Sequence, residues 1–300
     1  MSRTNNPDTP AFKPEEQEPN RDVNALFSSF RLDQASYRTF SRHRNSRPSE
    51  QFEALEPARQ QQAATHIAVF SPMGGSGKSM LVSSLAAVFW QLGKRVLLVD
   101  ASPWPTLAFH FGATSSRPGI RSFFAPSGPD LPVRILACDP NEPTIPEIDS
   151  YLGEAPVDYV LFDLSGVSAK ELIQYLQVCQ FLLVPLLPEP SALRSAEAML
   201  GLLASVPNPP QRVTYILNQM EDSPLAQNAA SNLAHLLGDQ LFQKPIHQQK
   251  EIPEALAEGI VLPMYAPKAQ AVSICGELAR WVESPKPTSP AKAPMRWSER

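Results

Sequence analysis

A glycine-rich segment that ends in a lysine and a serine, Gly74–Ser79 (GGSGKS), is the strongest indication of chemistry in this sequence. Glycines let backbone N–H groups close around a phosphate without Cβ clashes, and Lys78 adds a positive charge. The hydroxyl of Ser79 can coordinate Mg²⁺. The segment follows an apolar run, His66–Phe70, and precedes an amphipathic one. It therefore predicts a phosphate-binding loop in front of a helix N-terminus, with an ordinary glycine-rich turn as the alternative.

The residues that follow this loop predict the elements that would hold it. Residues 78–92 carry apolar side chains at helical spacing, and Gly93 is suited to end that helix. Residues 95–100 then form a short apolar run that is typical of a buried parallel strand. Strand, loop, helix and strand in this order indicate a βαβ unit with the loop at its first turn.

Two carboxylates end apolar runs and are candidate magnesium ligands. Asp100 ends the run after the helix, and Asp163 ends a later run, Tyr159–Asp163. In P-loop proteins an aspartate at the end of such a strand holds Mg²⁺ opposite the serine of the loop. An aspartate that only caps a strand is common. The combination of Asp163 with the loop, rather than the residue alone, therefore favours a metal site.

Apolar runs and amphipathic stretches alternate along the rest of the sequence. The expected strands are 66–71, 95–100, 133–138, 158–163, 180–185, 212–218 and 241–246, and the expected helices are 78–92, 168–178, 190–205, 224–237, 251–258 and 268–282. This alternation predicts an α/β fold with a doubly wound, mostly parallel sheet of about seven or eight strands and helices on both faces. A ligand would bind at the carboxyl ends of the strands, where the loop and Asp163 also fall.

Composition divides the 300 residues into three parts. Residues 1–64 and 284–300 are rich in proline and polar residues and are expected to be disordered, whereas 65–283 are expected to form the P-loop domain. The formal net charge of −4 gives no overall attraction to nucleic acid or to an anionic membrane. Without a signal peptide or an apolar run of about 18 residues, the sequence predicts a cytoplasmic protein that partners can recruit to the inner membrane, with no direct insertion.

Four blocks of sequence together resemble the ParA/MinD family of P-loop ATPases, of the SIMIBI class. Residues 73–79 resemble its deviant Walker A loop, and residues 97–112 resemble its first switch. Residues 184–193 resemble the segment after its next strand, and residues 246–268 resemble its C-terminal region. The likeness covers about residues 65–283, which is large enough for a complete domain.

This resemblance implies a protein that binds ATP and Mg²⁺ and forms a homodimer with ATP sandwiched between the two copies. The residues that would bind the nucleotide phosphates are Gly74, Gly75, Ser76, Gly77, Lys78, Ser79 and Met80. Ser79 would coordinate Mg²⁺, Asp163 would help through a water molecule, and Asp100 would lie farther from the metal.

Two positions depart from the family pattern, and both bear on hydrolysis. The family usually has a lysine at the position of Met73, which reaches the nucleotide of the other subunit. It also usually has a second aspartate at the position of Ser102, which positions the attacking water. Groups of these two kinds contribute about 10²–10⁵ to reaction rates. Their absence predicts very slow ATP hydrolysis and leaves the catalytic residue unknown, with Asp100 as a candidate.

Asn218 ends another apolar run and, by the resemblance, would contact adenine. Gln219 and Glu221 stand where a guanine-selective motif would need lysine and aspartate, which favours ATP over GTP. A residue that only caps the end of the strand is the alternative explanation for Asn218.

Within the family, Asp100–Pro103 most resembles the first switch of the accessory proteins of bacterial cellulose synthesis. We therefore expect a regulatory protein that works with other subunits of a cellulose synthase complex. A DNA-partition ATPase of the ParA type and a MinD-like positioning ATPase are the alternatives. The acidic balance, Met73 and Ser102 weigh against the first, and the acidic balance weighs against any binding of nucleic acid. The proline-rich C-terminal sequence weighs against the second, which would need an amphipathic membrane helix.

Residues 23–40 are apolar enough to bind another surface but too short to fold alone. The apolar side chains are Leu26, Phe27, Phe30, Leu32, Tyr37 and Phe40. Three alternatives are open, namely binding to the chain's own ATPase domain, binding to a partner, and a nascent helix without a partner. The stretch also resembles a small companion protein of the cellulose-synthesis accessory proteins.

Overall fold

The computed structural model describes residues 63–139, 141 and 156–285. The strands are β1 (Thr65–Val69), β2 (Val96–Asp100), β3 (Gly119–Phe123), β4 (Val133–Ala137), β5 (Tyr159–Asp163), β6 (Phe181–Leu186) and β7 (Arg212–Leu217). The helices are α2 (Lys78–Gln91), α4 (Ala169–Val178), α5 (Ser191–Ser205), α6 (Pro224–Leu237), α7 (Glu251–Ala257), α8 (Leu262–Tyr265) and α9 (Gln270–Glu283), with 3₁₀ turns η2 (Leu107–Phe111) and η3 (Gly238–Gln240). The stretch 23–40 and most of both predicted tails lie outside the described residues.

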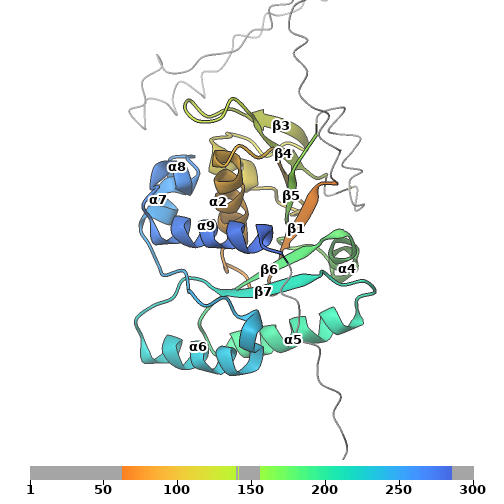
Figure 1. The fold of residues 1–300 in the computed structure, drawn as a ribbon, viewed down its shortest axis with the longest axis vertical. Coiled ribbons are helices and arrows are strands. Elements are labelled where there is room, and N and C mark those ends of the chain that lie inside the picture. The colour runs from red at the N-terminus through yellow and green to blue at the C-terminus, as the bar shows by residue number, and fades with distance from the viewer. Residues whose placement is uncertain (1–62, 140, 142–155, 286–300) are drawn as a thin grey trace, which may run out of the picture. The chain divides into compact units, whose positions relative to one another are not determined.

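The strands form one seven-stranded sheet in the order β3-β4-β2-β5-β1-β6-β7, seen nearly edge-on in Figure 1. All neighbouring strands run parallel except β3, which is antiparallel to β4. The chain leaves β1 toward the β2 side of the sheet and later returns to add β6 and β7 on the other side. This topology confirms the predicted doubly wound α/β fold and makes the end of β1 its switch point.

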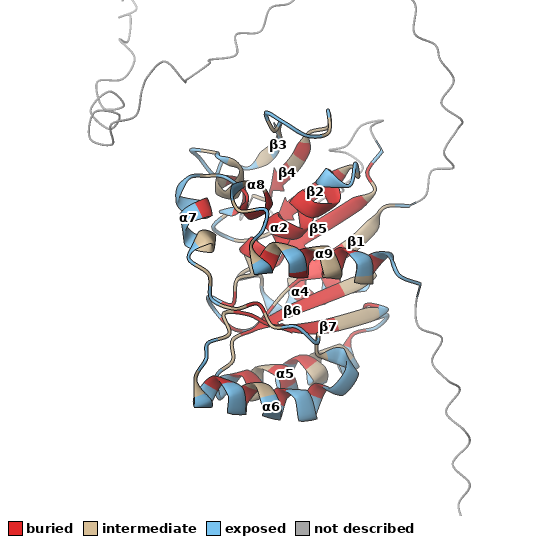
Figure 2. Cartoon of the chain, turned by 60° about the vertical axis from the view of Figure 1, so that its left-hand side comes forward, coloured by how far each residue is buried: buried red, intermediate tan, exposed pale blue. Residues whose placement is uncertain are grey.

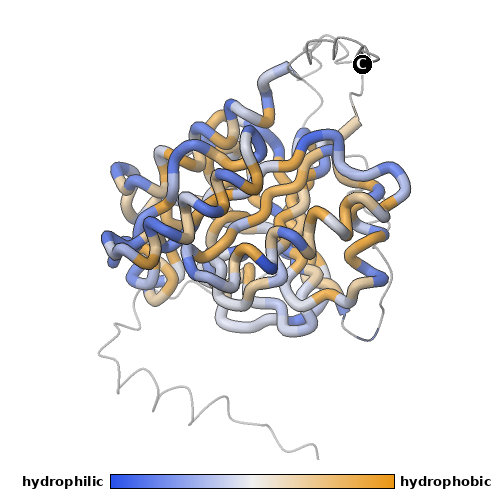
Figure 3. Tube along the Cα trace, turned by 90° about the horizontal axis from the view of Figure 1, so that it is seen from below, coloured by the Kyte–Doolittle hydropathy of each residue, from blue (hydrophilic) through white to orange (hydrophobic). Residues whose placement is uncertain are grey.

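Helices cover both faces of the sheet. Helices α2, α7, α8 and α9 pack on one face, and α4, α5 and α6 pack on the other, as Figure 1 shows. The strands between these two layers are mostly buried, while the outer faces of the helices are exposed (Figure 2). Hydrophobic residues accordingly gather in the middle of the molecule and polar residues along its outer turns (Figure 3). Burial of the sheet on both faces explains why its strands are continuous apolar runs.

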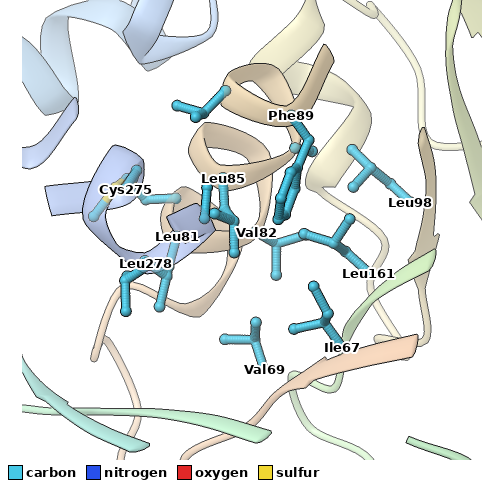
Figure 4. Packing of buried hydrophobic residues seen from close by; sticks show 14 of the residues in the cluster. Ile67, Val69, Leu81, Val82, Leu85, Phe89, Leu98, Leu161, Cys275 and Leu278 are labelled. Carbon is cyan, nitrogen blue, oxygen red and sulfur yellow. The ribbon is translucent and has the colours of Figure 1, made fainter. Parts of the chain in front are cut away.

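Helix α2 lies at the centre of one layer and is buried from Met80 to Trp90. It packs between the sheet and α9, so it needs apolar residues around its whole circumference. Figure 4 shows this packing with Leu81, Val82, Leu85 and Phe89 of α2, Ile67, Val69, Leu98 and Leu161 of the sheet, and Cys275 and Leu278 of α9. The ring of Phe89 stacks on that of Tyr159 with centroids 4.0 Å apart. These contacts fix the start of α2, and hence the loop before it, against the sheet.

The structure corrects the prediction of a strand over residues 241–246. This segment follows η3 and runs beside β7, but it touches that strand only at intervals. The N–H of Phe242 donates to Tyr215 O and the N–H of Ile246 donates to Leu217 O. Four residues of the segment thus span two of β7, and Pro245 in between lacks the N–H that a regular ladder needs.

The seventh strand is instead β3, which the sequence analysis did not identify. Its residues are half-buried or exposed because it lies at the edge of the sheet, so it has no continuous apolar run. The short helix α8 was also missed, since its four residues are fewer than hydrophobic periodicity can reveal.

The packing around α2 predicts that two leucines close together in the sequence, Leu85 and Leu92, contribute very differently to the free energy of unfolding. Leu85→Ala should lower the free energy of unfolding by about 2–5 kcal/mol, because the side chain is fully buried and its loss leaves a cavity. Leu92→Ala, one residue beyond the helix and 57% exposed, is the matched control and should change little. Urea unfolding of the two variants measures both values, and equal losses would contradict the central position of α2.

Candidate functional site

The candidate site lies at the carboxyl ends of the parallel strands, and four of these ends contribute to it, those of β1, β2, β5 and β7. In the strand register, Asp163 at the end of β5 is paired with Val69 at the end of β1 and with Asp100 at the end of β2. The glycine-rich loop follows β1 directly, and Asn218 follows the end of β7. The parallel sheet therefore brings together predicted site residues that are up to about 140 positions apart in the sequence.

The loop Gly74–Gly77 has the backbone that its glycines predict. Gly75 and Gly77 have φ angles of 68° and 86°, which a residue with a side chain rarely adopts. Gly77 is also the residue just before α2, and a Cβ there would lie 2.2 Å from Nδ2 of Asn218. Ser76 is fully buried, and its Oγ has no hydrogen-bond partner among the described residues. A phosphate oxygen would provide such a partner.

Lys78 is held at the mouth of this loop. Its Nζ donates a hydrogen bond of 3.0 Å to Met73 O, so the ammonium is folded back across the loop. Burial lowers the pKa of Lys78, and the nearby carboxylate of Asp163 opposes this change. The side chain of Met73 is 7% exposed and belongs to the apolar cluster on the α4 face of the sheet. It therefore offers neither charge nor reach beyond the surface.

Asp163 has an unsatisfied oxygen that fits a metal ion. The carboxyl group is buried, Oδ1 accepts a 2.5 Å hydrogen bond from Ser165, and Oδ2 makes no hydrogen bond of ordinary geometry to a described residue. Burial raises the pKa of Asp163, although the hydroxyls of Ser165 and Ser79 and the charge of Lys78 lower it. Ser79 and Asp163 are hard oxygen donors close to the phosphate loop, which suits Mg²⁺ with phosphate and water as its remaining ligands.

Asp100 anchors the loop that follows β2. Its Oδ2 accepts a hydrogen bond of 2.8 Å from the N–H of Leu107, and its Oδ1 accepts one of 3.2 Å from the N–H of Ser102. Burial and then repulsion by Asp163 raise the pKa of Asp100 to about 7, while these backbone hydrogen bonds lower it. Because both of its carboxyl oxygens accept backbone hydrogen bonds, Asp100 holds the conformation of this loop beside the site.

Ser102 is engaged within its own loop. Its Oγ accepts from the N–H of Trp104 and donates to Trp104 O, at 3.2 and 3.1 Å. Trp104 itself is 84% exposed. In the sequence, Ser102 stands out for the carboxylate that it lacks, whereas no sequence pattern marks Trp104 as a surface residue.

Asn218 contacts the phosphate loop through its amide. Its Nδ2 donates to Ser76 O at 2.7 Å, while its Oδ1 accepts from the N–H of Gln219 at 3.0 Å. The side chain is buried in this arrangement, and its contact with adenine stays a prediction. Gln219 was considered only as evidence against guanine, yet its Nε2 donates to Gly75 O at 2.6 Å.

The fold and the loop define a P-loop nucleotide-binding protein. Residues 67–262 match the model of the CobQ/CobB/MinD/ParA nucleotide binding domain. The chain therefore belongs to this family, in which the resemblance had placed it. The described residues contain no group of three or more His, Cys, Asp or Glu that could hold a metal ion alone.

Known relatives and structures agree with this family. The chain is 27% identical over 237 residues to the chromosome-partitioning ATPase Soj of Thermus thermophilus, and the match covers 72% of this chain and 94% of Soj. A structure of a Cyanothece McdA variant in complex with ATP is 16% identical with a TM-score of 0.58, over 74% of this chain and 98% of McdA. The septum site-determining protein MinD of Pyrococcus horikoshii, complexed with Mg-ADP, is 18% identical with a TM-score of 0.56, over 74% and 97% of the two chains.

Nucleotide binding should depend on Lys78, whose ammonium lies across the loop. Lys78→Ala should lower ATP affinity at least about tenfold, because a charge-assisted hydrogen bond to phosphate is lost. Lys170→Ala, at an exposed position in the first turn of α4, is the matched control and should leave affinity unchanged. Isothermal titration calorimetry measures both, and unchanged affinity in Lys78→Ala would exclude the loop as the nucleotide site.

The buried carboxylates predict that the nucleotide-free protein loses stability as the pH rises. The raised pKa of Asp100, about 7 instead of 3.8, stabilises the fold below the unfolded pKa, and this contribution is lost as pH rises through 7. His110 acts in the opposite direction, because burial lowers its pKa to about 4, and most of its effect is complete above pH 6.5. In a metal chelator, stability should therefore fall only slightly between pH 6.5 and 8, by well under about 1.4 kcal/mol in all, because the folded Asp100 carboxyl is already partly ionised at pH 6.5 and His110 offsets part of the change.

Thermal unfolding across this pH range checks the expectation. Asp100→Asn removes the titrating group and should flatten the slope, whatever its effect on absolute stability. A slope that persists unchanged in this variant would assign the titration to another group.

Proposed function

We propose that this protein is an ATP-binding switch that dimerises around ATP and hydrolyses it very slowly. The observation that supports the proposal is how the side chains of Met73 and Ser102 are packed and hydrogen-bonded. Met73 is buried in an apolar cluster, and the hydroxyl of Ser102 is occupied by the backbone of Trp104. Neither provides the charge that stabilises a phosphoryl-transfer transition state or the carboxylate that orients a water.

The groups that bind nucleotide are retained. The loop glycines, Lys78 and the two buried oxygens of Ser76 and Asp163 are suited to phosphate and Mg²⁺. Related structures with bound ATP, in McdA, and with Mg-ADP, in MinD, support these two ligands for the present chain. Mg²⁺ would neutralise charge between the phosphates and Asp163, which Lys78 only partly offsets. Binding without turnover would leave ATP itself as the signal.

We further propose that the process served is bacterial cellulose synthesis. The support is the first switch, Asp100–Pro103, which resembles that of BcsQ, the accessory protein of this system. Other subunits of the synthase complex would be the partners. Residues 23–40, which resemble the companion protein BcsR, are the candidate contact, with binding to their own domain as the alternative. No helix among residues 63–139 and 156–285 has the length and hydropathy to cross a membrane.

Chromosome partition is the second candidate, because Soj is among the curated relatives. Partition by this kind of ATPase would require salt-dependent DNA binding by basic residues and a hydrolytic cycle. The net charge of −4 and the two departures at Met73 and Ser102 favour the first proposal. A mobility shift on random duplex DNA at low salt distinguishes the two.

The rate of ATP hydrolysis and the nucleotide dependence of dimerisation test the proposed switch. In a single-turnover assay the unmodified protein should keep most of its ATP, and sedimentation should show dimers with ATP and monomers with ADP or no nucleotide. The double variant Met73→Lys, Ser102→Asp should hydrolyse faster, because it restores a charge and a water-orienting carboxylate. Each single variant is the matched control.

Hydrolysis by the unmodified protein at the rate of the double variant would refute the slow switch. Identical sedimentation in all three nucleotide states would refute ATP-dependent dimerisation. For the cellular role, deletion of the gene should lower cellulose output, which the unmodified gene should restore and the Lys78→Ala gene should not. Normal cellulose output after deletion would leave chromosome partition as the proposal to pursue.

A further inference from the structure

Gln219 combines a strained backbone with a contact to the phosphate loop. Its φ angle is 57°, in the left-handed region that residues with a side chain rarely adopt. Among the described residues the other non-glycine with a positive φ is Asn208, at 55°, a residue type that tolerates this region. Strain of this kind persists only where surrounding interactions maintain it, and it marks functional positions.

Three hydrogen bonds maintain the conformation of Gln219. Its N–H donates to Asn218 Oδ1 at 3.0 Å, and the N–H of the next residue, Met220, donates to Ile246 O at 2.9 Å. Its side-chain Nε2 donates to Gly75 O at 2.6 Å. The left-handed turn thus directs the carboxamide from the end of β7 onto the loop after β1.

The contact belongs to a pair that fixes two consecutive peptide groups of the loop. Gln219 binds Gly75 O, and Asn218 binds Ser76 O at 2.7 Å. Because C=O and N–H point in opposite directions across a trans peptide, each bond also sets the direction of the following N–H. The N–H groups of Ser76 and Gly77 are thereby turned away from the two amides.

In a phosphate-binding loop, backbone N–H groups such as these two would donate to the phosphate oxygens. A loop that contains glycines with free φ angles would otherwise sample several orientations of these peptides. Holding them before the ligand arrives reduces the ordering cost of binding. The two side-chain amides thus order the loop peptides in the nucleotide-free protein, so that nucleotide binding does not have to supply the free energy for this ordering.

We propose that Gln219 is a positioning residue, which preorganises the backbone donors of the phosphate-binding loop through its hydrogen bond to Gly75 O. The role rests on the proposed nucleotide binding at this loop. It differs from base recognition, because the contact is made to the backbone of the loop. Substitution at Gln219 should consequently change affinity for the triphosphate and for pyrophosphate alike.

The test uses two variants of the full chain and one control. Gln219→Gly relieves the left-handed strain and removes the amide, whereas Gln219→Met keeps the length of the side chain and removes only the amide. Both should bind Mg-ATP about tenfold more weakly, the loss expected for one hydrogen bond that orders a binding loop. Asn208→Gly, the matched change at the other positive φ, should leave affinity unchanged.

Two further readouts separate positioning from a structural role. The melting temperature of nucleotide-free Gln219→Gly should equal or exceed that of the unmodified protein, since glycine has no penalty at φ 57°. Hydrogen exchange of the amides of residues 74–78 in the nucleotide-free protein should become several-fold faster in both Gln219 variants. Exchange elsewhere should stay the same.

The outcomes distinguish this proposal from the proposed function. If the unmodified protein fails to bind Mg-ATP, the nucleotide switch is refuted, and loop exchange still decides the role of Gln219. Affinity within about twofold of the unmodified protein in Gln219→Met would overturn the proposal, because packing rather than the hydrogen bond would then be sufficient. Unchanged loop exchange in both variants would overturn it as well.

Discussion

The site depends on two buried carboxylates at the ends of adjacent strands. Asp100 and Asp163 are paired in the register of β2 and β5, and both are 1% exposed. Two negative charges so placed repel each other, and burial penalises each of them. Hydrogen bonds from the backbone to Asp100 and the charge of Lys78 near Asp163 reduce this cost only in part, since both pKa values remain raised. The arrangement is suited to a cation, which the nucleotide would bring with it.

The doubly wound sheet is what makes this arrangement available. With β1 between β5 and β6, the loop after β1 lies directly beside Asp163, and the end of β7 lies on the other side. Helix α2 is apolar all round because it is enclosed by the sheet and α9, so the loop at its start has a rigid support.

The sequence was sufficient to predict features that rest on local rules. Gly74–Ser79 and the buried parallel strands have patterns that few other structures produce, so the fold class and the place of the loop could be predicted. Residues 241–246 show the limit, because their apolar side chains pack beside β7 while Pro245 and the spacing of the hydrogen bonds exclude a ladder. The contact of Gln219 with Gly75 O could not be foreseen either, since it joins residues 144 positions apart through one backbone angle.

Nucleotide affinity and ATP hydrolysis would depend on different residues of this site. The phosphate loop, Lys78 and Asp163 would act on charges that are present in the ground state, so they would contribute to binding whether or not a bond is broken. A lysine at position 73 and a carboxylate at position 102 would act mainly on charge that develops in the transition state. Met73 instead packs in the apolar core, and the hydroxyl of Ser102 accepts a hydrogen bond from the N–H of Trp104 within a turn. In the proposed switch, a site that keeps its binding interactions and lacks its transition-state interactions would hold its ligand longer than a site that also hydrolyses it.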